Sequence, residues 1–284
     1  MEGAHNFSGA HILQIPYDSG RRDFRMGYGP TRIAQQFAGL KGFTSETIAV
    51  EDHPFELGTT MCVVRAASEK VRSAISRGRL PILLAGGCIN SLASLSALDS
   101  QPGLFWFDAH GDFNTPETTR SGFIDGMALA AITGRCWRTL TASIPGFRPI
   151  PERNVVLIGA RDFDAEERSA LESSDLTRLN TESIRNGGLD CAISKVLTGL
   201  PQSVYLHIDL DVLDREAARV NEYSSTGGLT VTEVLEAIRF IRHHRAIVGA
   251  AITAYDPSVD IHSKALEAAV AVVKELTATC IDIC

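Results

Sequence analysis

The sequence lacks the features that mark several large classes of protein. Its six cysteines form no CxxC pair and no regular spacing, which argues against a zinc finger or a disulfide framework. No apolar run approaches the roughly 18 residues of a membrane span, and the first residues show no basic segment followed by an apolar one. The net charge is −7 and the basic residues are scattered, which argues against binding to nucleic acid or to an anionic membrane. These absences predict a cytoplasmic protein with reduced thiols.

The remaining composition predicts one globular domain over residues 1–284. The 284 residues are 44% hydrophobic and 21% charged, and no repeat, low-complexity tract or long linker divides them. Strands that alternate with helices indicate an α/β fold with a parallel sheet and helices on both faces. We predict strands at 11–15, 48–50, 81–84, 104–107, 154–159, 203–211 and 246–253. Helical periodicity predicts helices at 30–38, 60–77, 90–98, 125–133, 164–171, 181–197, 230–243 and 258–275.

One apolar segment, residues 104–107, ends abruptly in Asp108, His110 and Asp112. The apolar run is typical of a strand that is buried on both faces of a parallel sheet. The polar triplet then follows the carboxyl end of the strand, where open α/β sheets place their ligand sites. Two carboxylates and an imidazole suit Mn²⁺ or another divalent ion. Taken alone, the triplet fits a solvated strand end equally well.

A second apolar segment carries the same arrangement of acids. Residues 204–208 continue into Asp209 and Asp211, and a strand through Asp211 places His207 and both acids on one side. Unpaired acids in a buried strand would be strongly destabilising. A metal ion is the simplest way to satisfy both clusters, so the two motifs together predict a site for two divalent ions.

The two motifs resemble those of the ureohydrolase family, which comprises arginases, agmatinases and formiminoglutamases. The segments Asp-Ala-His-Gly-Asp-Phe-Asn-Thr-Pro (108–116) and His-Ile-Asp-Leu-Asp-Val-Leu-Asp (207–214) are similar to two metal motifs of the family. The similarity extends from Gly29 to Pro257. It implies a three-layer α/β/α fold around a mostly parallel sheet of about eight strands. It also implies two divalent ions, a small guanidino or amidino substrate, and a homo-oligomer, either a trimer or a hexamer.

The resemblance implies six metal ligands, one of which departs from the family pattern. They are Asp108 and Asp209 as bridges between the ions, His110 and Asp211 at one ion, and Cys88 and Asp112 at the other. Ala-Gly-Gly-Cys stands where the family has Gly-Gly-Asp-His, so Cys88 takes the place of a histidine. Mn²⁺ is the expected ion, but a thiolate is softer than an imidazole and favours Zn²⁺ or Fe²⁺. Alternatively, Cys88 is a small buried thiol after a turn.

Four further positions match residues that act on the substrate in arginases. Asn114 and Ser121 match contacts to the substrate α-carboxylate, and Asp164 matches the residue that holds the α-amino group. Each of these residues also suits an ordinary turn or helix start. Asp125 replaces a histidine that serves as a proton shuttle. A buried carboxyl can take that catalytic role, or it can satisfy N–H groups at a helix N-terminus.

The largest departure lies near the end of the similarity. Ala254 stands where the family has the glutamate that pairs with the substrate guanidinium. Asp256 is the nearest acid that could replace it as a substrate-binding residue, although a turn acid before Pro257 is the better interpretation. Without that carboxylate, an ordinary guanidinium loses its best partner.

The resemblance implies a hydrolase in which hydroxide held by two metal ions attacks the guanidino or amidino carbon and releases a urea or substituted urea. Asp125 or solvent would then protonate the leaving amine. The retained substrate positions favour an arginine-like amino acid, and the changes at positions 88 and 254 resemble a subgroup that hydrolyses Nω-hydroxy-L-arginine. Two alternatives remain, namely a catalytically silent protein that binds a ligand or partner, and a formimino or amide hydrolase.

Overall fold

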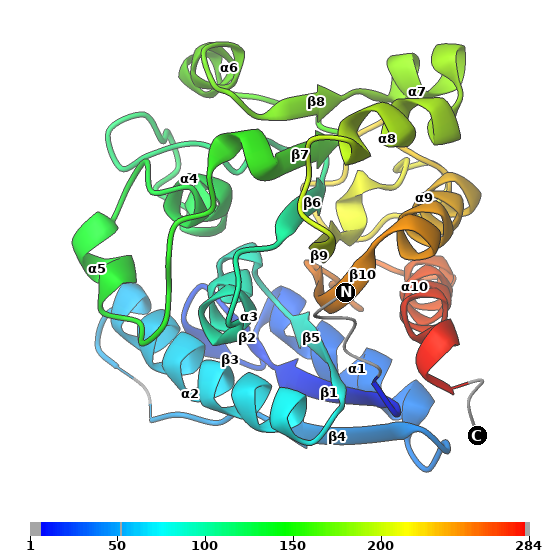
Figure 1. Cartoon of the computed structure of the whole chain (residues 1–284). Helices are drawn as coiled ribbons and strands as arrows, with labels where there is room; N and C mark the ends of the chain where they lie inside the picture. The colour runs from blue at the N-terminus through cyan, green and yellow to red at the C-terminus, as the bar shows by residue number, and fades with distance from the viewer. Residues whose placement is uncertain (1–6, 52, 282–284) are drawn as a thin grey trace.

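Eight parallel strands form the central sheet in a computed structural model that describes residues 7–51 and 53–281 (Figure 1). The spatial order is β4-β1-β5-β10-β9-β6-β7-β8. The first six residues and Cys284 lie outside the described residues. The strands are β1 (Ala10–Ile15), β4 (Phe43–Thr47), β5 (Leu80–Ala85), β6 (Gly103–Phe107), β7 (Val155–Ile158), β8 (Thr177–Leu179), β9 (Ser203–Asp209) and β10 (Ala246–Thr253). A small antiparallel pair, β2 (Tyr17–Asp18) and β3 (Arg21–Arg22), follows β1.

Helices cover both faces of the sheet, which gives the predicted three layers (Figure 1). One face packs against α1 (Gly29–Ala34), α7 (Thr181–Gly187), α8 (Leu189–Leu197), α9 (Val231–His244) and α10 (Lys264–Ile281). The other packs against α2 (Glu56–Ser76), α3 (Ser91–Ala97), α4 (Ala128–Ile132), α5 (Arg138–Ala142) and α6 (Ala165–Glu172). None of the helices in the described part of the chain has the length and apolarity that a bilayer crossing requires.

The central strands are apolar throughout because both of their faces are buried. In β5, Ile82 and Leu84 belong to the hydrophobic core on the α10 side, whereas Leu83 belongs to the core on the α2 side. Val273 of α10 and Val64 of α2 are fully buried in these two cores. The alternation follows from the two-residue period of a strand, which sends successive side chains to opposite faces of the sheet.

Four neighbouring strands, β5, β10, β9 and β6, occupy the middle of the sheet. The chain segments that follow their carboxyl ends begin at Gly86, Ala254, Leu210 and Asp108. These strands carry the predicted metal motifs, and their parallel pairing brings the ends of all four to one edge. The site therefore lies where the strand order changes direction, which is the usual ligand position in open α/β sheets.

The predicted elements differ from the structure mainly at the sheet edges and at breaks in the backbone. The edge strand β4 lies at Phe43–Thr47 instead of 48–50, and β8 and α5 were not predicted. These edge strands are half exposed and polar, so they lack the apolar run that marks a buried strand. The single helix predicted at 181–197 is two helices, separated at Gly188, whose φ of 79° interrupts the helix. The C-terminal helix begins at Lys264, six residues later than predicted.

The turn after β5 depends on a glycine at position 86. A Cβ atom there would collide with the carbonyl oxygen of Tyr17. We expect Gly86→Ala to lower the free energy of unfolding by about 2–3 kcal/mol, measured by chemical denaturation, because this backbone contact cannot relax easily. Gly187→Ala, where an added Cβ meets nothing within 4 Å, is the matched control and should leave stability unchanged or slightly raised. Equal effects for the two variants would contradict this account of the turn.

Candidate functional site

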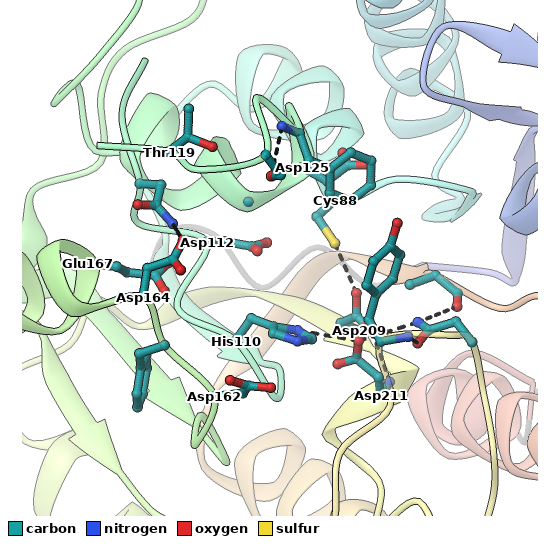
Figure 2. Close-up of a pocket in the computed structure, with 18 of the residues that line it drawn as sticks. Cys88, His110, Asp112, Thr119, Asp125, Asp162, Asp164, Glu167, Asp209 and Asp211 are labelled. Carbon is teal, nitrogen blue, oxygen red and sulfur yellow. Dashed lines mark hydrogen bonds and ion pairs between the residues drawn. The ribbon is translucent and has the colours of Figure 1, made fainter. Parts of the chain in front are cut away.

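A cavity of about 350 Å³ opens at the carboxyl edge of the sheet (Figure 2). Cys88, Asp209 and Asp211 lie at one end of it, and Asp164 and Glu167 lie at the other. The volume is that of a pocket for a small molecule. Ten of the eleven site residues predicted from the sequence either line the cavity or have a ligand atom within 4.8 Å of residues that line it. They are Cys88, Asp108, His110, Asp112, Asn114, Ser121, Asp125, Asp164, Asp209 and Asp211.

The first group of metal-ligating atoms centres on Cys88, which begins a short 3₁₀ turn, Cys88–Asn90, after β5. Its Sγ atom donates to Asp209 Oδ2 at 3.0 Å and lies 3.4 Å from the hydroxyl of Thr253. Ligand atoms of Cys88, Asp108, His207 and Asp209 all lie within 4.8 Å of one another. All four residues are buried, so this group can enclose a cation.

The second group contains Asp108, His110 and Asp211, whose ligand atoms also lie within 4.8 Å of one another. His110 Nδ1 is 3.3 Å from Asp108 Oδ1 and 3.4 Å from Asp211 Oδ2. The strand prediction fails at one point here, since β9 ends at Asp209 and the chain turns into a 3₁₀ helix, Leu210–Val212. The Asp209 side chain stabilises that turn by accepting from the Asp211 N–H at 2.8 Å. The turn, rather than strand alternation, brings Asp211 into the site.

The carboxylates of the two groups repel one another. Burial and the charges of neighbouring acids raise the pKa of Asp108, Asp112 and Asp209. Burial also opposes ionisation of Asp211, but the charge and hydrogen bond of His110 outweigh it and lower the Asp211 pKa. Oδ2 of Asp112 is buried and has no hydrogen-bond partner among the described residues. A divalent cation satisfies such an oxygen and relieves the repulsion, so these residues fit a metal centre.

Asp125 lies against the turn that carries Cys88. Its Oδ1 accepts from the Ile89 N–H at 3.0 Å, and a side chain at Gly87 would collide with its Oδ2. Burial raises the pKa of Asp125 to about 7. The carboxyl thus satisfies N–H groups at the start of a 3₁₀ turn distant in the sequence, and it also lines the cavity. Both interpretations made from the sequence, the proton carrier and the N–H acceptor, are compatible with this position.

The end of the cavity opposite to Cys88 is polar. Asn114 Nδ2 donates to Asp164 Oδ2 at 3.3 Å, so two predicted substrate-binding residues lie side by side. Ser121 lines the same cavity, and its Oγ accepts from the Phe123 N–H. Glu167, from the first turn of α6, is buried there and accepts from the Phe113 N–H at 2.9 Å. An anionic and amide-rich end of this kind can hold an ammonium group.

Asp256, the remaining predicted substrate-binding residue, is not among the residues that line the cavity. Its Oδ1 accepts from the Ser258 N–H at 2.9 Å, which makes it a turn acid, and this position does not support contact with a substrate. Ala254 does line the cavity, with a left-handed φ of 63°. Its carbonyl accepts from Asn221 Nδ2 at 2.9 Å, and the same amide lies 3.3 Å from Asp211 Oδ2. An amide and a methyl group therefore occupy this wall of the cavity.

Sequence reasoning missed the aromatic wall of the cavity. The rings of Phe123 and Tyr223 stack with centroids 5.6 Å apart, and both side chains line the cavity. Arg25 donates to the Tyr223 hydroxyl at 3.2 Å and pairs with the buried carboxylate of Asp18. Phe123 and Tyr223 come from loops with no strand or helix period. Nothing in their local sequence indicates that they meet.

The carboxyl of Glu167 makes the stability of the metal-free protein depend on pH. Burial raises the pKa of Glu167 to about 7, above the ordinary value of 4.5. The contribution of this carboxyl to the free energy of unfolding is therefore complete below pH 4.5 and is lost as the pH rises through 7. The side chain in Glu167→Gln does not titrate. As the pH rises from 4 to 8, the free energy of unfolding of this variant should therefore increase relative to that of wild type by about 2–3 kcal/mol, measured by denaturation with a chelator present. Glu166→Gln, at an exposed position, should stay within about 0.5 kcal/mol at both pH values. A Glu167 variant with no pH-dependent gain would show that this carboxyl ionises normally.

Comparison with known proteins agrees with this geometry. The sequence model of the Arginase family matches residues 8–278. The arginase of Bacillus caldovelox is 30% identical over 289 residues, which cover 93% of this chain and 96% of that protein. The arginase of Bacillus subtilis strain 168 is also 30% identical, with the same coverage. The crystal structure of arginase from Bacillus cereus has a TM-score of 0.84 at 26% identity, covering 94% of this chain and 98% of that one.

These matches confirm the predicted family and fold class. The family uses a pair of metal ions, and this chain has two groups of residues whose ligand atoms could hold a metal ion. The chain belongs to the arginase family, and it is a hydrolase of amidine or guanidino C–N bonds.

Proposed function

We propose that this protein hydrolyses the substituted guanidino group of an arginine-like amino acid, with Nω-hydroxy-L-arginine as the specific candidate. The observation that carries the proposal is the polarity of the cavity along its length. Metal-ligating acids lie at one end, and the paired Asn114 and Asp164 lie at the other. An amino acid whose side chain ends in a C–N group to be hydrolysed fits this arrangement.

The metal centre would use six residues. His110 and Asp211 would hold one ion, Cys88 and Asp112 the other, and Asp108 and Asp209 both. The imidazole and oxygen donors of the first set suit Mn²⁺, whereas the thiolate of the second favours Zn²⁺ or Fe²⁺. When bound, the ions supply a water molecule of lowered pKa as the nucleophile.

The amino-acid end of the substrate would lie against α6 and the loop before it. Asp164 offers its carboxylate to the α-amino group, and Glu167 adds a second acid within the same cavity. Asn114 and Ser121 offer an amide and a hydroxyl to the α-carboxylate. Because such contacts fix the position of the reacting carbon, their loss should reduce both binding and turnover.

The end of the cavity near Asp211 is the reason for proposing a substituted guanidino group as the part of the substrate that is hydrolysed. Ala254 and the Asn221 amide leave the wall near Asp211 without a carboxylate that could pair with a guanidinium. A hydroxyguanidino group is less basic than a guanidino group and binds in its neutral form more readily. It therefore depends less on such a carboxylate, which favours the hydroxylated substrate over plain arginine.

Asp125 is the residue that can deliver a proton to the leaving amine. Its carboxyl lines the cavity, and its pKa of about 7 keeps a fraction protonated at neutral pH. Its Oδ1 accepts from the Ile89 N–H, which holds the carboxyl at the wall of the cavity.

A substrate screen of metal-loaded protein tests the proposal. We expect release of hydroxyurea from Nω-hydroxy-L-arginine at a rate well above release of urea from arginine or agmatine, with Asp108→Ala as the inactive control. Formamide release from a formimino substrate would support an amide-type hydrolase instead. No turnover of any substrate by metal-loaded protein would favour a silent binding protein. The retained buried acids argue against that last outcome, since they are destabilising where no cation uses them.

A further inference from the structure

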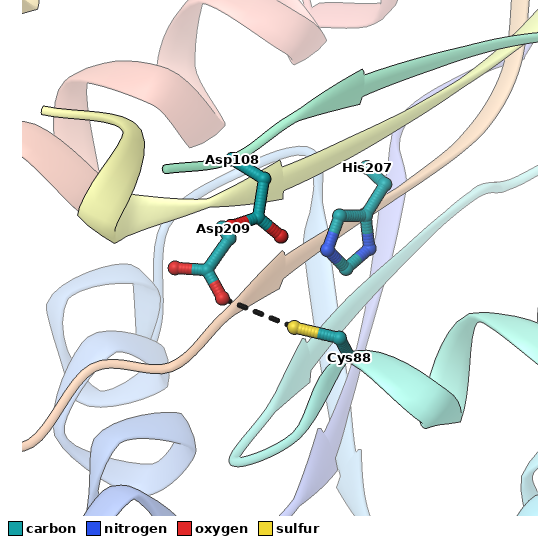
Figure 3. Close-up of side chains that lie close together, drawn as sticks. All are labelled: Cys88, Asp108, His207 and Asp209. Carbon is teal, nitrogen blue, oxygen red and sulfur yellow. Dashed lines mark hydrogen bonds between the residues drawn. The ribbon is translucent and has the colours of Figure 1, made fainter. Parts of the chain in front are cut away.

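The six predicted metal ligands do not include the imidazole of His207, which lies beside three of them. This residue lies on β9 two positions before Asp209, so both side chains project from the same face of the strand. It is fully buried, and its ring stacks on Trp106 with centroids 3.5 Å apart and planes 10° from parallel. The stack fixes the plane of the imidazole, and Figure 3 shows the ring facing Asp108 and Asp209.

The two ring nitrogens of His207 have unequal partners. Nδ1 lies 2.8 Å from Ser91 Oγ, a good hydrogen bond that fixes the orientation of the ring. Nε2 has only the Thr253 hydroxyl, at 3.4 Å, which is longer than an ordinary hydrogen bond. That hydroxyl is also 3.4 Å from Cys88 Sγ and from Asp209 Oδ2, so Nε2 lies on the side of the thiol and carboxylates. Metal-binding histidines are typically held in this way, with one nitrogen hydrogen-bonded and the other free for the ion.

The donor set around this nitrogen is that of a zinc site. A ring nitrogen of His207, Cys88 Sγ and one oxygen each of Asp108 and Asp209 lie within 4.8 Å of one another. Thiolate sulfur, imidazole nitrogen and carboxylate oxygen are the kinds of donor that Zn²⁺ binds in proteins. The buried Asp112 Oδ2 beside them has no partner among the described residues, which independently indicates that a cation belongs here.

We propose that His207 is a direct ligand of the ion at the Cys88 end of the centre, where Cys88, His207, Asp108 and Asp209 together select Zn²⁺. The proposal rests on the metal-dependent function proposed above and adds a seventh ligand to its six, so that the ion at this end would have five donors, with Asp112 as the fifth. The set of Asp108, His110 and Asp211 offers no sulfur and suits Mn²⁺. The two halves of one centre would then prefer different metals.

The rival explanation is that His207 acts only through Thr253, by orienting its hydroxyl toward Asp209 Oδ2. Two substitutions separate the explanations. His207→Asn keeps a polar atom near Ser91 and removes the nitrogen that faces the thiol. Thr253→Val keeps the shape of the side chain and removes the hydroxyl.

The test is zinc binding to the full chain, followed by chelator competition and by anomalous diffraction at the zinc edge. In wild type we expect Zn²⁺ at about 2.0–2.1 Å from His207 Nε2 and about 2.3 Å from Cys88 Sγ. His207→Asn should weaken zinc binding on the order of 100-fold, while Thr253→Val should change it less than about threefold.

Zinc held by Cys88 and the acids, with His207 still directed to Thr253, would overturn the proposal while leaving the metal-dependent function intact. A larger loss in Thr253→Val than in His207→Asn would overturn it in the same way. A wild-type protein that binds no zinc, manganese or iron would overturn both proposals. The diffraction measurement uses wild type, so a folding defect in either variant does not affect it.

Discussion

Asp209→Asn is expected to reduce hydrolysis of the best substrate by roughly 10³-fold or more, which corresponds to about 4 kcal/mol of transition-state stabilisation. Asp108 is common to both ligand groups, and Asp209 contacts a member of each. Its Oδ2 accepts from the thiol of Cys88, and its Oδ1 holds the N–H of Asp211. Neutralising it should therefore affect both ions at once. Steady-state kinetics on metal-loaded protein measures the loss.

The same substitution should stabilise the protein when a chelator is present. Burial and the charges of Asp211 and Asp108 raise the pKa of Asp209, so its ionised form opposes folding at neutral pH. We expect Asp209→Asn to raise the free energy of unfolding by about 1–3 kcal/mol without metal and to abolish the gain that metal gives wild type. Asp99→Asn, at an exposed position, is the control and should change neither quantity. Retained activity, or a loss of stability with and without metal, would show that Asp209 is a structural acid.

Cys88→His is expected to reverse the metal preference of the centre. The thiolate of Cys88 favours Zn²⁺ or Fe²⁺, whereas an imidazole in its place binds Mn²⁺ better than a thiolate does. We expect the ratio of zinc to manganese affinity to fall by about 100-fold, and Cys88→Ser to lose zinc affinity by a similar factor. Competition dialysis with metal analysis measures both. The cavity beside Cys88 leaves room for the larger side chain.

Cys62→Ser is the matched control for the cysteine variants, since Cys62 is an exposed thiol on α2. It should leave the metal ratio unchanged. If Cys88→Ser bound zinc as tightly as wild type, Cys88 would be the small buried thiol of the alternative interpretation. In the structure its pKa is raised by burial and by the surrounding acids, which favours the neutral thiol where no cation is bound.

The central strands and the metal motifs could be predicted from the sequence because a strong local signal marks each of them. A fully apolar run such as Gly103–Phe107 is typical of a strand with two buried faces, and acids at its end have few structural uses. Parallel pairing then brings separate motifs together, so Asp108 and Asp209 meet although about a hundred residues separate them. The residues of these two motifs that line the cavity could therefore be predicted from the sequence.

The remainder of the site depends on tertiary contacts that leave no local pattern. The turn at Asp209 moves Asp211 off the strand, which strand periodicity does not predict. Phe123 and Tyr223 meet across two irregular loops. His207 lies beside Cys88, Asp108 and Asp209 because Trp106 and Ser91, from two other elements, fix its ring. The edge strand β4 escaped prediction for a different reason, since an exposed edge needs no apolar face.

The central claim is that these paired acids bind two divalent ions. Equilibrium dialysis of wild type against Mn²⁺, Zn²⁺ and Fe²⁺, singly and in pairs, followed by metal analysis, tests it most directly. We predict two ions per chain under at least one of these conditions and a clear loss in Asp209→Asn. Fewer than one ion per chain under every condition, with the variant indistinguishable from wild type, would contradict the account.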